Sequence, residues 1–295
     1  MRPEVMRPDA TRPIDRESAM SIDAIQKYYA QYDEWGRLET PAGRLEMRRC
    51  LRTLHAHLAP HSRVLDLGGG PGRYTIELAR RGHQMTLVDL SDKHVRRARR
   101  ELSEHDLWER VDAVEQGDAR AVDALDADSF DAVVAFGPFY HLIDPDDRRR
   151  AAAEVARLLR PGGLAFVQYL PAASGFVRLI DRAAEWPEQL DSDTIDRALE
   201  EHIYQNPSDA GFQEGCYAET SDIDALFDSV GVERIDAVSV RGIAAGREDK
   251  LERIRDESPL LYEKMVELIE ATSRRPEVIA MGQIALWVGR QRTVH

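Results

Sequence analysis

Short apolar runs alternate with amphipathic segments between residues 62 and 170. Five runs have the length and composition of strands that are buried on both faces: RVLDL (63–67), QMTLV (84–88), VDAVE (111–115), FDAVVAF (130–136) and GLAFVQY (163–169). Because such alternation is typical of parallel strands joined by crossover helices, it predicts an α/β fold, Rossmann-like, with helices on both faces of the sheet.

The segments between these runs carry helix start and stop signals. Asp144 is expected to be an N-cap, with Pro145 at the first helical position and the sequence Pro161–Gly163 just past the end of the helix. Ser91 is expected to cap the arginine-rich helix, and Gly82 to end the helix before it.

The alternation is interrupted at residue 171. Residues 171–220 are rich in aromatic residues, proline and glycine, and we interpret them as an insertion that holds one or two helices. Ser221 is then expected to cap a helix, followed by a sixth strand over 232–240, a long helix over about 247–272 and a final strand over 282–290.

This reading divides the chain into five parts. They are a disordered lead (1–18), a helical N-terminal cover (19–58), a cofactor-binding core (59–170), a substrate-cap insertion after the fifth strand (171–220) and a segment that completes the core sheet (221–295). The lead mixes Arg, Pro and acids without an apolar run, so it does not resemble a signal peptide.

The cover is dense in aromatic residues. Tyr28, Tyr32 and Trp35 have i, i+4, i+7 spacing and would share one helix face, either as a packing face or as a lid over the site. Tyr29 would point elsewhere, and we expect it to contact the cofactor.

The amino-acid composition limits the classes of partner that we expect. The 295 residues carry a net charge of −13, which disfavours nucleic acid, and the one dense basic cluster, KHVRRARR (93–100), is read as a solvated helix face. The two cysteines have no disulfide or zinc spacing, the histidines and acids form no metal motif, and no apolar window could span a membrane. We therefore expect a cytoplasmic protein without a metal.

Glycines crowd the end of the first strand. In VLDLGGGPGRYTIELA (64–79), the glycines do not have first, third and sixth spacing, because Arg73 occupies the sixth position, so a pyrophosphate loop fits poorly. Asp66 would repel a pyrophosphate and suits a cationic ligand instead. The glycines would let the backbone approach that ligand closely.

Two more acids follow the next strands. Asp89 is placed to accept both hydroxyls of a ribose, and Asp118 is placed to meet an exocyclic amine of an adenine. Each acid has an alternative local role: Asp66 as a helix cap, Asp89 in a turn and Asp118 in an Asx turn. Together, one acid near a charged amine, one at a ribose and one at an adenine match the parts of S-adenosyl-L-methionine (SAM).

At this point the sequence resembles the class I SAM-dependent methyltransferases of the small-molecule type. VLDLGGGPG looks like the first motif of the family, FDAVVAFGPFYHL like its fourth-strand motif, and RLLRPGGLAFVQY like the helix, turn and fifth strand that follow. The resemblance implies seven strands, with the last one antiparallel and inserted between the fifth and sixth. It implies cofactor contacts from Asp66, Gly68, Gly69, Gly70, Gly72, Asp89, Leu90, Asp118, Ala119, Phe136 and Gly137.

The acceptor is expected to be a small organic molecule, methylated on O, N or C. His141 is the first candidate for a general base, beside Tyr140, although both residues could simply shape the pocket. The insertion aromatics are expected to line an apolar acceptor pocket: Phe176, Trp186, Tyr204, Phe212 and Tyr217.

Other functions stay open. One is an RNA methyltransferase that contacts phosphates through residues 93–100, and another is a SAM-binding regulatory protein without catalysis. A nicotinamide dehydrogenase is the least favoured because of the glycine spacing and Asp66. A homo-oligomer is compatible with the sequence.

Overall fold

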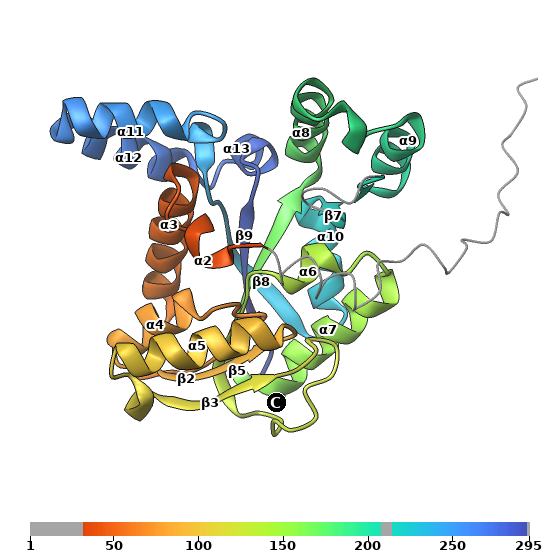
Figure 1. Cartoon of the computed structure of the whole chain (residues 1–295). Helices are drawn as coiled ribbons and strands as arrows, with labels where there is room; N and C mark the ends of the chain where they lie inside the picture. The colour runs from red at the N-terminus through yellow and green to blue at the C-terminus, as the bar shows by residue number, and fades with distance from the viewer. Residues whose placement is uncertain (1–31, 208–213, 294–295) are drawn as a thin grey trace, which may run out of the picture.

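A twisted sheet with helices on both faces forms the centre of the computed structural model, which describes residues 32–207 and 214–293 (Figure 1). Its first five strands are β1 (Arg63–Leu67), β2 (Gln84–Asp89), β3 (Val111–Gln116), β4 (Phe130–Ala135) and β5 (Leu159–Pro171). They lie parallel in the order β3-β2-β1-β4-β5. All five predicted strands are confirmed.

The far edge of the core sheet is antiparallel. Strand β9 (Ala285–Gln291) pairs antiparallel with β5 and also with β8 (Val232–Ser239), so it lies between them. The predicted α/β fold and the inserted antiparallel last strand are therefore confirmed.

Helices cover both faces because side chains alternate along each strand. Val64 of β1 joins the core under α3 (Pro41–His57), α4 (Arg73–Arg80) and α5 (Asp92–Glu104). Leu65, its neighbour, points to the opposite core, under α7 (Pro145–Leu158) and α10 (Thr220–Asp228). Burial on both faces explains why the strands are nearly continuous apolar runs.

Several predicted helix signals are present in the structure. The Asp144 carboxylate accepts a hydrogen bond from the Asp146 backbone N–H at 2.7 Å, with Pro145 at the first helical position of α7. Ser91 Oγ accepts from the His94 N–H at 3.4 Å at the start of α5, and Gly82 has a φ of +89° just after α4. The two side chains each accept a backbone N–H that the first turn of a helix leaves without a partner, and the left-handed glycine allows the chain to turn away after α4.

Two predictions for the C-terminal helices are wrong. The single helix expected over 247–272 is two helices, α11 (Glu248–Glu257) and α12 (Pro259–Thr272), because Pro259 lacks an N–H and disfavours helical geometry in Ser258 before it. Helix α10 is capped by Glu219, in a capping box with Asp222, and not by Ser221. A carboxylate at the N-cap can receive the same backbone N–H.

The insertion adds two strands that the sequence pattern did not predict. Helices α8 (Ala172–Glu185) and α9 (Ser192–Glu201), with the short 3-10 helix η3 (Pro187–Gln189) between them, lead to β6 (Ile203–Gln205) and β7 (Glu214–Ala218). Strand β7 pairs with the last two residues of β5, and β6 pairs antiparallel with β7, giving a nine-stranded sheet. The strand count therefore exceeds the predicted seven.

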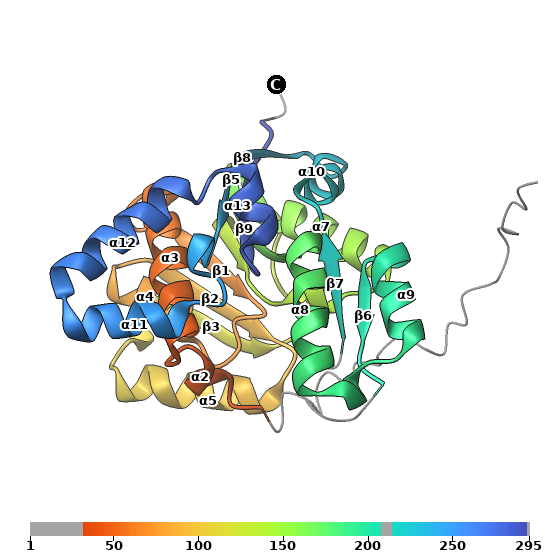
Figure 2. The ribbon, with the colours of Figure 1, turned by 90° about the horizontal axis from the view of Figure 1, so that it is seen from above.

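The cover consists of α2 (Glu34–Arg37) and α3 within the described residues. Tyr32 precedes α2, so it shares no helix face with Trp35, while Tyr28 and Tyr29 lie outside the described residues. In Figures 1 and 2, α2 lies between the α11–α12 pair and the α8–α9 pair.

The remaining elements are short: η2 (Trp108–Arg110), α6 (Pro138–His141), η4 (Gly242–Ala244) and α13 (Pro276–Met281). In the described part of the chain, no helix has the length and apolar character needed to cross a membrane.

Candidate active site

A cavity of about 1040 Å³, which includes space open to solvent, lies at the carboxyl ends of β1, β2 and β4. Ligands bind at this edge of open parallel sheets. The predicted site residues that line it are Asp66, Gly68, Gly69, Gly70, Asp89, Leu90, Asp118, Ala119, Phe136, Gly137, Tyr140 and His141. Gly72 is instead the left-handed N-cap residue of α4, and Tyr29 lies outside the described residues.

The glycine turn brings the backbone close to the cavity. A Cβ on Gly69 would lie 2.7 Å from the carboxyl carbon of Asp66, so a side chain here would displace that carboxylate. Gly70 has a φ of +56°, and its Cβ would point toward Glu34 and His94, which both line the cavity. Glycine is needed here for its left-handed geometry and its lack of a side chain.

The Asp89 carboxylate is oriented by backbone N–H groups of two loops. Its Oδ2 accepts from the Gly70 N–H at 2.7 Å and its Oδ1 from the Ser91 N–H at 2.8 Å. His94 Nδ1 lies 3.3 Å from Oδ1. The carboxylate is therefore fixed at the end of β2 and joins the glycine turn to the start of α5.

Asp66 is a buried carboxyl group whose pKa is raised to about 6. Burial is the main cause, and the charge of Asp89 adds to it, whereas a 2.6 Å hydrogen bond from Thr75 Oγ1 opposes it. A carboxyl group in this state gains from a nearby positive charge, which would stabilise its ionised form. A cation bound beside Asp66 would therefore lower this pKa.

Asp118 is held by a neighbouring arginine. Arg120 Nε donates to both Asp118 carboxylate oxygens at 3.0 Å, and Arg120 also pairs with Asp147 at 2.6 Å. Burial acts to raise the pKa of Asp118, but the hydrogen bonds and charge of Arg120 lower it below the ordinary value. Asp118 is therefore an ionised hydrogen-bond acceptor at the cavity wall, where Arg120 already occupies part of its capacity.

Tyr140 and His141 belong to α6, which starts directly after β4. Their rings lie 4.7 Å apart. Burial lowers the pKa of His141 to about 4, although a hydrogen bond with the Glu214 backbone and the charge of Asp89 act against this. The imidazole is therefore neutral at pH 7. Because Glu214 begins β7, the insertion contacts the site through this histidine.

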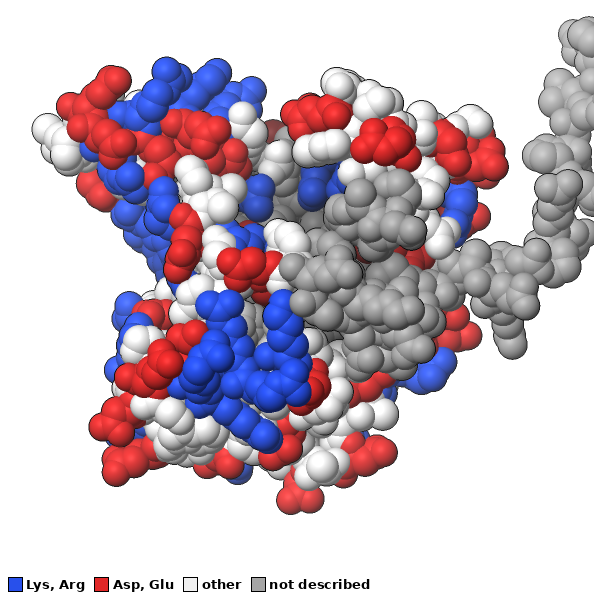
Figure 3. Space-filling view, in the orientation of Figure 1, with Lys and Arg blue, Asp and Glu red and all other residues white. Residues whose placement is uncertain are grey.

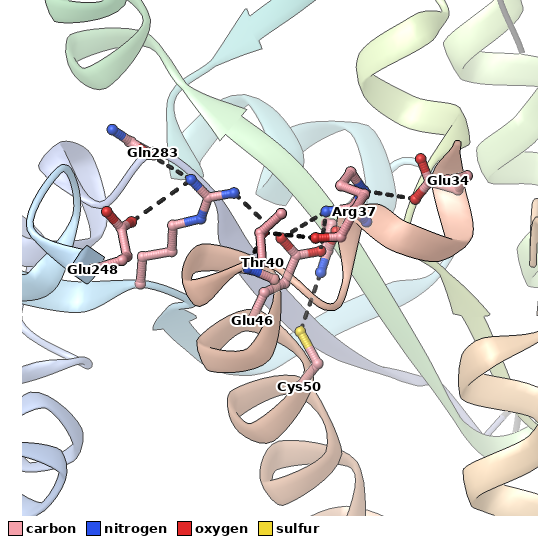
Figure 4. A network of polar contacts seen from close by, with 10 residues as sticks. Glu34, Arg37, Thr40, Glu46, Cys50, Glu248 and Gln283 are labelled. Carbon is pink, nitrogen blue, oxygen red and sulfur yellow. Dashed lines mark hydrogen bonds and ion pairs between the residues drawn. The ribbon is translucent and has the colours of Figure 1, made fainter. Parts of the chain in front are cut away.

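The sequence analysis missed the residues of α2 that line the cavity, Glu34 and Arg37. Arg37 Nε lies 2.7 Å from a Glu34 carboxylate oxygen, and its Nη1 lies 2.9 Å from the buried carboxylate of Glu46 (Figure 4). Burial raises the pKa of Glu34, and Arg37 opposes that rise. The spacing of Glu34 and Arg37 was visible as an i, i+3 pair, but nothing local placed it over the glycine turn.

The prediction that the insertion aromatics line this cavity is wrong for the described residues. Tyr204 and Tyr217 are buried with Leu170 in a separate cluster, against which Phe176 and Tyr140 pack. Trp186 is 47% exposed, and Phe212 lies outside the described residues. These rings pack together because β7 lies against α8, where Phe176 contacts Tyr217.

No group of three or more His, Cys, Asp or Glu side chains within residues 32–207 and 214–293 is arranged to hold a metal ion.

Comparison with known proteins matches residues 64–163 to the family model of a methyltransferase domain. This range starts in β1 and ends in β5, so it contains the glycine turn and all three acids. Because of this match, residues 64–163 are called the methyltransferase domain below. The resemblance to the class I SAM-dependent methyltransferases is confirmed, and SAM is the cofactor of that family.

Curated relatives match up to about half of the chain. A ubiquinone biosynthesis O-methyltransferase of Xanthomonas axonopodis pv. citri is 34% identical over 157 residues, which is 50% of this chain and 62% of that protein. The SAM-dependent Diels-Alderase iliD of Neonectria sp. is 31% identical over 124 residues, which is 42% of this chain and 45% of that protein. The chain thus spans less than two thirds of these relatives.

Solved structures share the fold of the methyltransferase domain and its flanking parts. PH0226 from Pyrococcus horikoshii OT3 superposes with a TM-score of 0.61 at 16% identity, over 90% of this chain and 99% of that one. The CcbJ methyltransferase of Streptomyces caelestis has a TM-score of 0.56 at 18% identity, over 91% and 96%. The [4+2]-cyclase SpnF has a TM-score of 0.51 at 20% identity, over 85% and 82%.

Proposed function

We propose that this protein is a SAM-dependent methyltransferase that acts on a small organic acceptor. The observation that carries the proposal is the cavity at the strand ends, where Asp66 lies beside the glycine turn and Asp89 accepts a hydrogen bond from it. A cationic nucleoside ligand matches both the charge of this cavity and the lack of a pyrophosphate loop.

Each part of the cofactor has a suitable group in the cavity. Asp89 would accept the ribose hydroxyls, while Asp118 and Ala119 would border the adenine. Asp66 would favour the cationic methionine end, and Arg37 from the cover would pair with its carboxylate. The side-chain-free backbone of Gly70 fits a ligand lying against the turn. When bound, the cofactor supplies a methyl group that is already strongly electrophilic.

The protein then has to align the acceptor and exclude water. Tyr140 and His141 follow β4 at the wall of the cavity, where they would contact the acceptor. A neutral His141 can accept a hydrogen bond from an acceptor O–H or N–H. Its pKa of about 4 makes it a weak base, so it is better suited to holding a proton donor than to removing an unactivated proton.

The basic cluster gives little support to an RNA substrate. Within α5, Arg96, Arg97, Arg99 and Arg100 all form ion pairs with carboxylates. The neighbouring carboxylates lower the net positive charge of this helix face, which weakens its attraction for phosphates. A small acceptor is also consistent with the cavity.

A second function follows from two relatives. The Diels-Alderase iliD and the [4+2]-cyclase SpnF are named after ring-forming reactions. A specific alternative is therefore a protein that binds SAM and transfers no methyl group.

Incubating the full chain with SAM and a panel of phenols, amines and carbon acids separates these functions. We expect S-adenosylhomocysteine and a methylated product with at least one acceptor, and a loss of both with Asp89→Ala. The matched control Asp92→Ala, an exposed acid of α5, should keep the activity. SAM binding without transfer to any acceptor would favour the cyclase type, whereas no SAM binding would overturn the proposal.

A further inference from the structure

One face of α8 points toward two tyrosines of the insertion. A Cβ on Gly175 would lie 2.7 Å from the Tyr217 ring, and Arg182 stacks on Tyr204 with its guanidinium carbon 4.4 Å from the ring centroid. Arg178 lies at i+3 from Gly175 and at i−4 from Arg182, so it is on the same helix face. Its side chain therefore starts between Tyr217 and Tyr204.

The two arginines of α8 differ in their partners. Arg182 donates to Gln189 Oε1 at 2.7 Å and to the Tyr204 hydroxyl at 2.9 Å. Arg178 is partly buried, yet it forms no hydrogen bond or ion pair among the described residues. Burial lowers its pKa, and the positive charges of Arg182 and Arg241 act in the same direction. A partly buried guanidinium without an acceptor is unfavourable unless a ligand completes it.

Arg241 also has donor capacity to spare. Its Nη1 lies 2.7 Å from Gln283 Oε1 and 3.7 Å from Glu248, and its Nη2 lies 3.5 Å from Glu46 (Figure 4). Its Nε is buried without a hydrogen-bond acceptor in the described part of the chain. Its two ion pairs are therefore long, and its Nε has capacity for a further acceptor.

Shared neighbours connect this pair of arginines to residues of the cofactor cavity, although neither arginine lines it. Glu46 also binds Arg37, which lines that cavity, and Tyr140, another lining residue, packs against the cluster that contains Tyr217. Figure 3 shows a hollow between the lobe of α11 and α12 and the lobe of α8, with Lys or Arg atoms inside it. A molecule that reaches the cavity past Tyr140 would bring its far end to Arg178.

We propose that Arg178, assisted by Arg241, binds a carboxylate of the methyl acceptor, so that the substrates are small aromatic or alicyclic acids. This rests on the proposed function. Guanidinium groups bind carboxylates with paired, charge-assisted hydrogen bonds, and the aromatic ring of Tyr140, which lines the cavity, would hold the apolar body.

The unpartnered guanidinium of Arg178 favours a monoanion. Arg37 and Arg241 form ion pairs with Glu34, Glu46 and Glu248, and Arg182 donates to Gln189 and Tyr204. Among the described residues Arg178 has no such partner, and one carboxylate would match its single charge.

The test is calorimetric titration of the full chain with benzoate, benzamide and phenyl phosphate, both with and without saturating S-adenosylhomocysteine. We expect benzoate to bind about tenfold or more tightly than neutral benzamide, and Arg178→Gln to remove this difference. Arg197→Gln, which alters an arginine of α9 in the same insertion, is the matched control and should keep the preference.

Folding is checked in the same variants. Arg178→Gln should not lower the melting temperature, because no described acceptor loses a partner, and its affinity for S-adenosylhomocysteine should equal that of the unmodified chain. Equal binding of benzoate and benzamide, or a preference that survives Arg178→Gln, would overturn the inference. Tighter binding of phenyl phosphate would overturn the assignment to a monoanion. If S-adenosylhomocysteine fails to bind while benzoate is still selected, the proposed function fails and the arginine site stands.

Discussion

Asp66 combines burial with a position beside the expected sulfonium. Because its folded pKa is raised to about 6 from an ordinary value of 3.8, its stabilising contribution is complete below pH 3.8 and is lost as the pH rises through about 6. Ionising it in the free protein therefore costs stability, up to about 3 kcal/mol. A cationic ligand would reverse this cost.

SAM affinity should therefore rise with pH. Between pH 5 and 7 the Asp66 carboxyl group becomes mostly ionised, so the dissociation constant for SAM should fall about tenfold. Calorimetry at several pH values measures this, with Asp66→Asn as the variant in which the pH dependence disappears. A pH dependence that is the same in both proteins would show that Asp66 is not the group that senses the cation.

His141 gives a second prediction at this scale. With a pKa of about 4, it stays neutral from pH 5 to 9, so the transfer rate should follow the ionisation of the acceptor itself. Rates measured with a series of phenols of different acidity should show inflections that move with the phenol. An inflection fixed near pH 6.5 that vanishes in His141→Gln would instead identify the histidine as a general base with an ordinary pKa.

A site residue could be predicted when the neighbouring sequence showed its place in the fold. Asp66, Asp89 and Asp118 could be placed at the cavity because each follows a strand, and the carboxyl ends of parallel strands share one edge. Glu34 and Arg37 could not, because their position depends on how α2 folds over a turn more than thirty residues away in sequence.

Among the elements, the core strands were predictable and the insertion was not. The core strands are apolar runs with local turn signals, whereas β7 joins the sheet through two residue pairs, Leu170 with Tyr217 and Pro171 with Ala218. Strands as short as β6 (IYQ) and β7 (EGCYA) carry no apolar run or periodic signal. The break at Pro259 was visible locally, but the apolar periodicity on both sides of it favoured one helix.

Helix α2 is held over the cavity by Trp35. The guanidinium carbons of Arg73 and Arg97 lie 4.6 and 4.7 Å from the ring centroid of Trp35, and Arg73 belongs to α4 whereas Arg97 belongs to α5. Cation–π contacts contribute about 0.5–2 kcal/mol each. The ring therefore fixes Glu34 and Arg37 at the cavity wall.

Trp35→Ala should weaken SAM binding about tenfold, because the cover residues are no longer held in place. Titration with SAM measures the effect, and Trp186→Ala, which removes an exposed tryptophan outside the cavity lining, is the control. If both variants bind SAM as tightly as the unmodified chain, α2 does not contribute to the cofactor site.

At the scale of the whole molecule, three parts far apart in sequence meet at one edge of the sheet. The methyltransferase domain supplies the acids and the glycine turn, the cover supplies Arg37, and the insertion meets the site at His141. This arrangement explains why an acidic protein presents arginines toward its cleft. The net charge alone disfavoured nucleic acid, but it could not show which charged side chains face the cavity.

The most direct measurement is calorimetric titration of the full chain with SAM and, separately, with NAD. We expect SAM to bind with a dissociation constant on the order of micromolar, NAD not to bind, and Asp89→Ala to weaken SAM binding about 10- to 100-fold. Asp92→Ala should bind SAM normally, and melting temperatures verify that both variants are folded. Failure of the unmodified chain to bind SAM, or undiminished binding by Asp89→Ala, would contradict the assignment of this cavity to the cofactor.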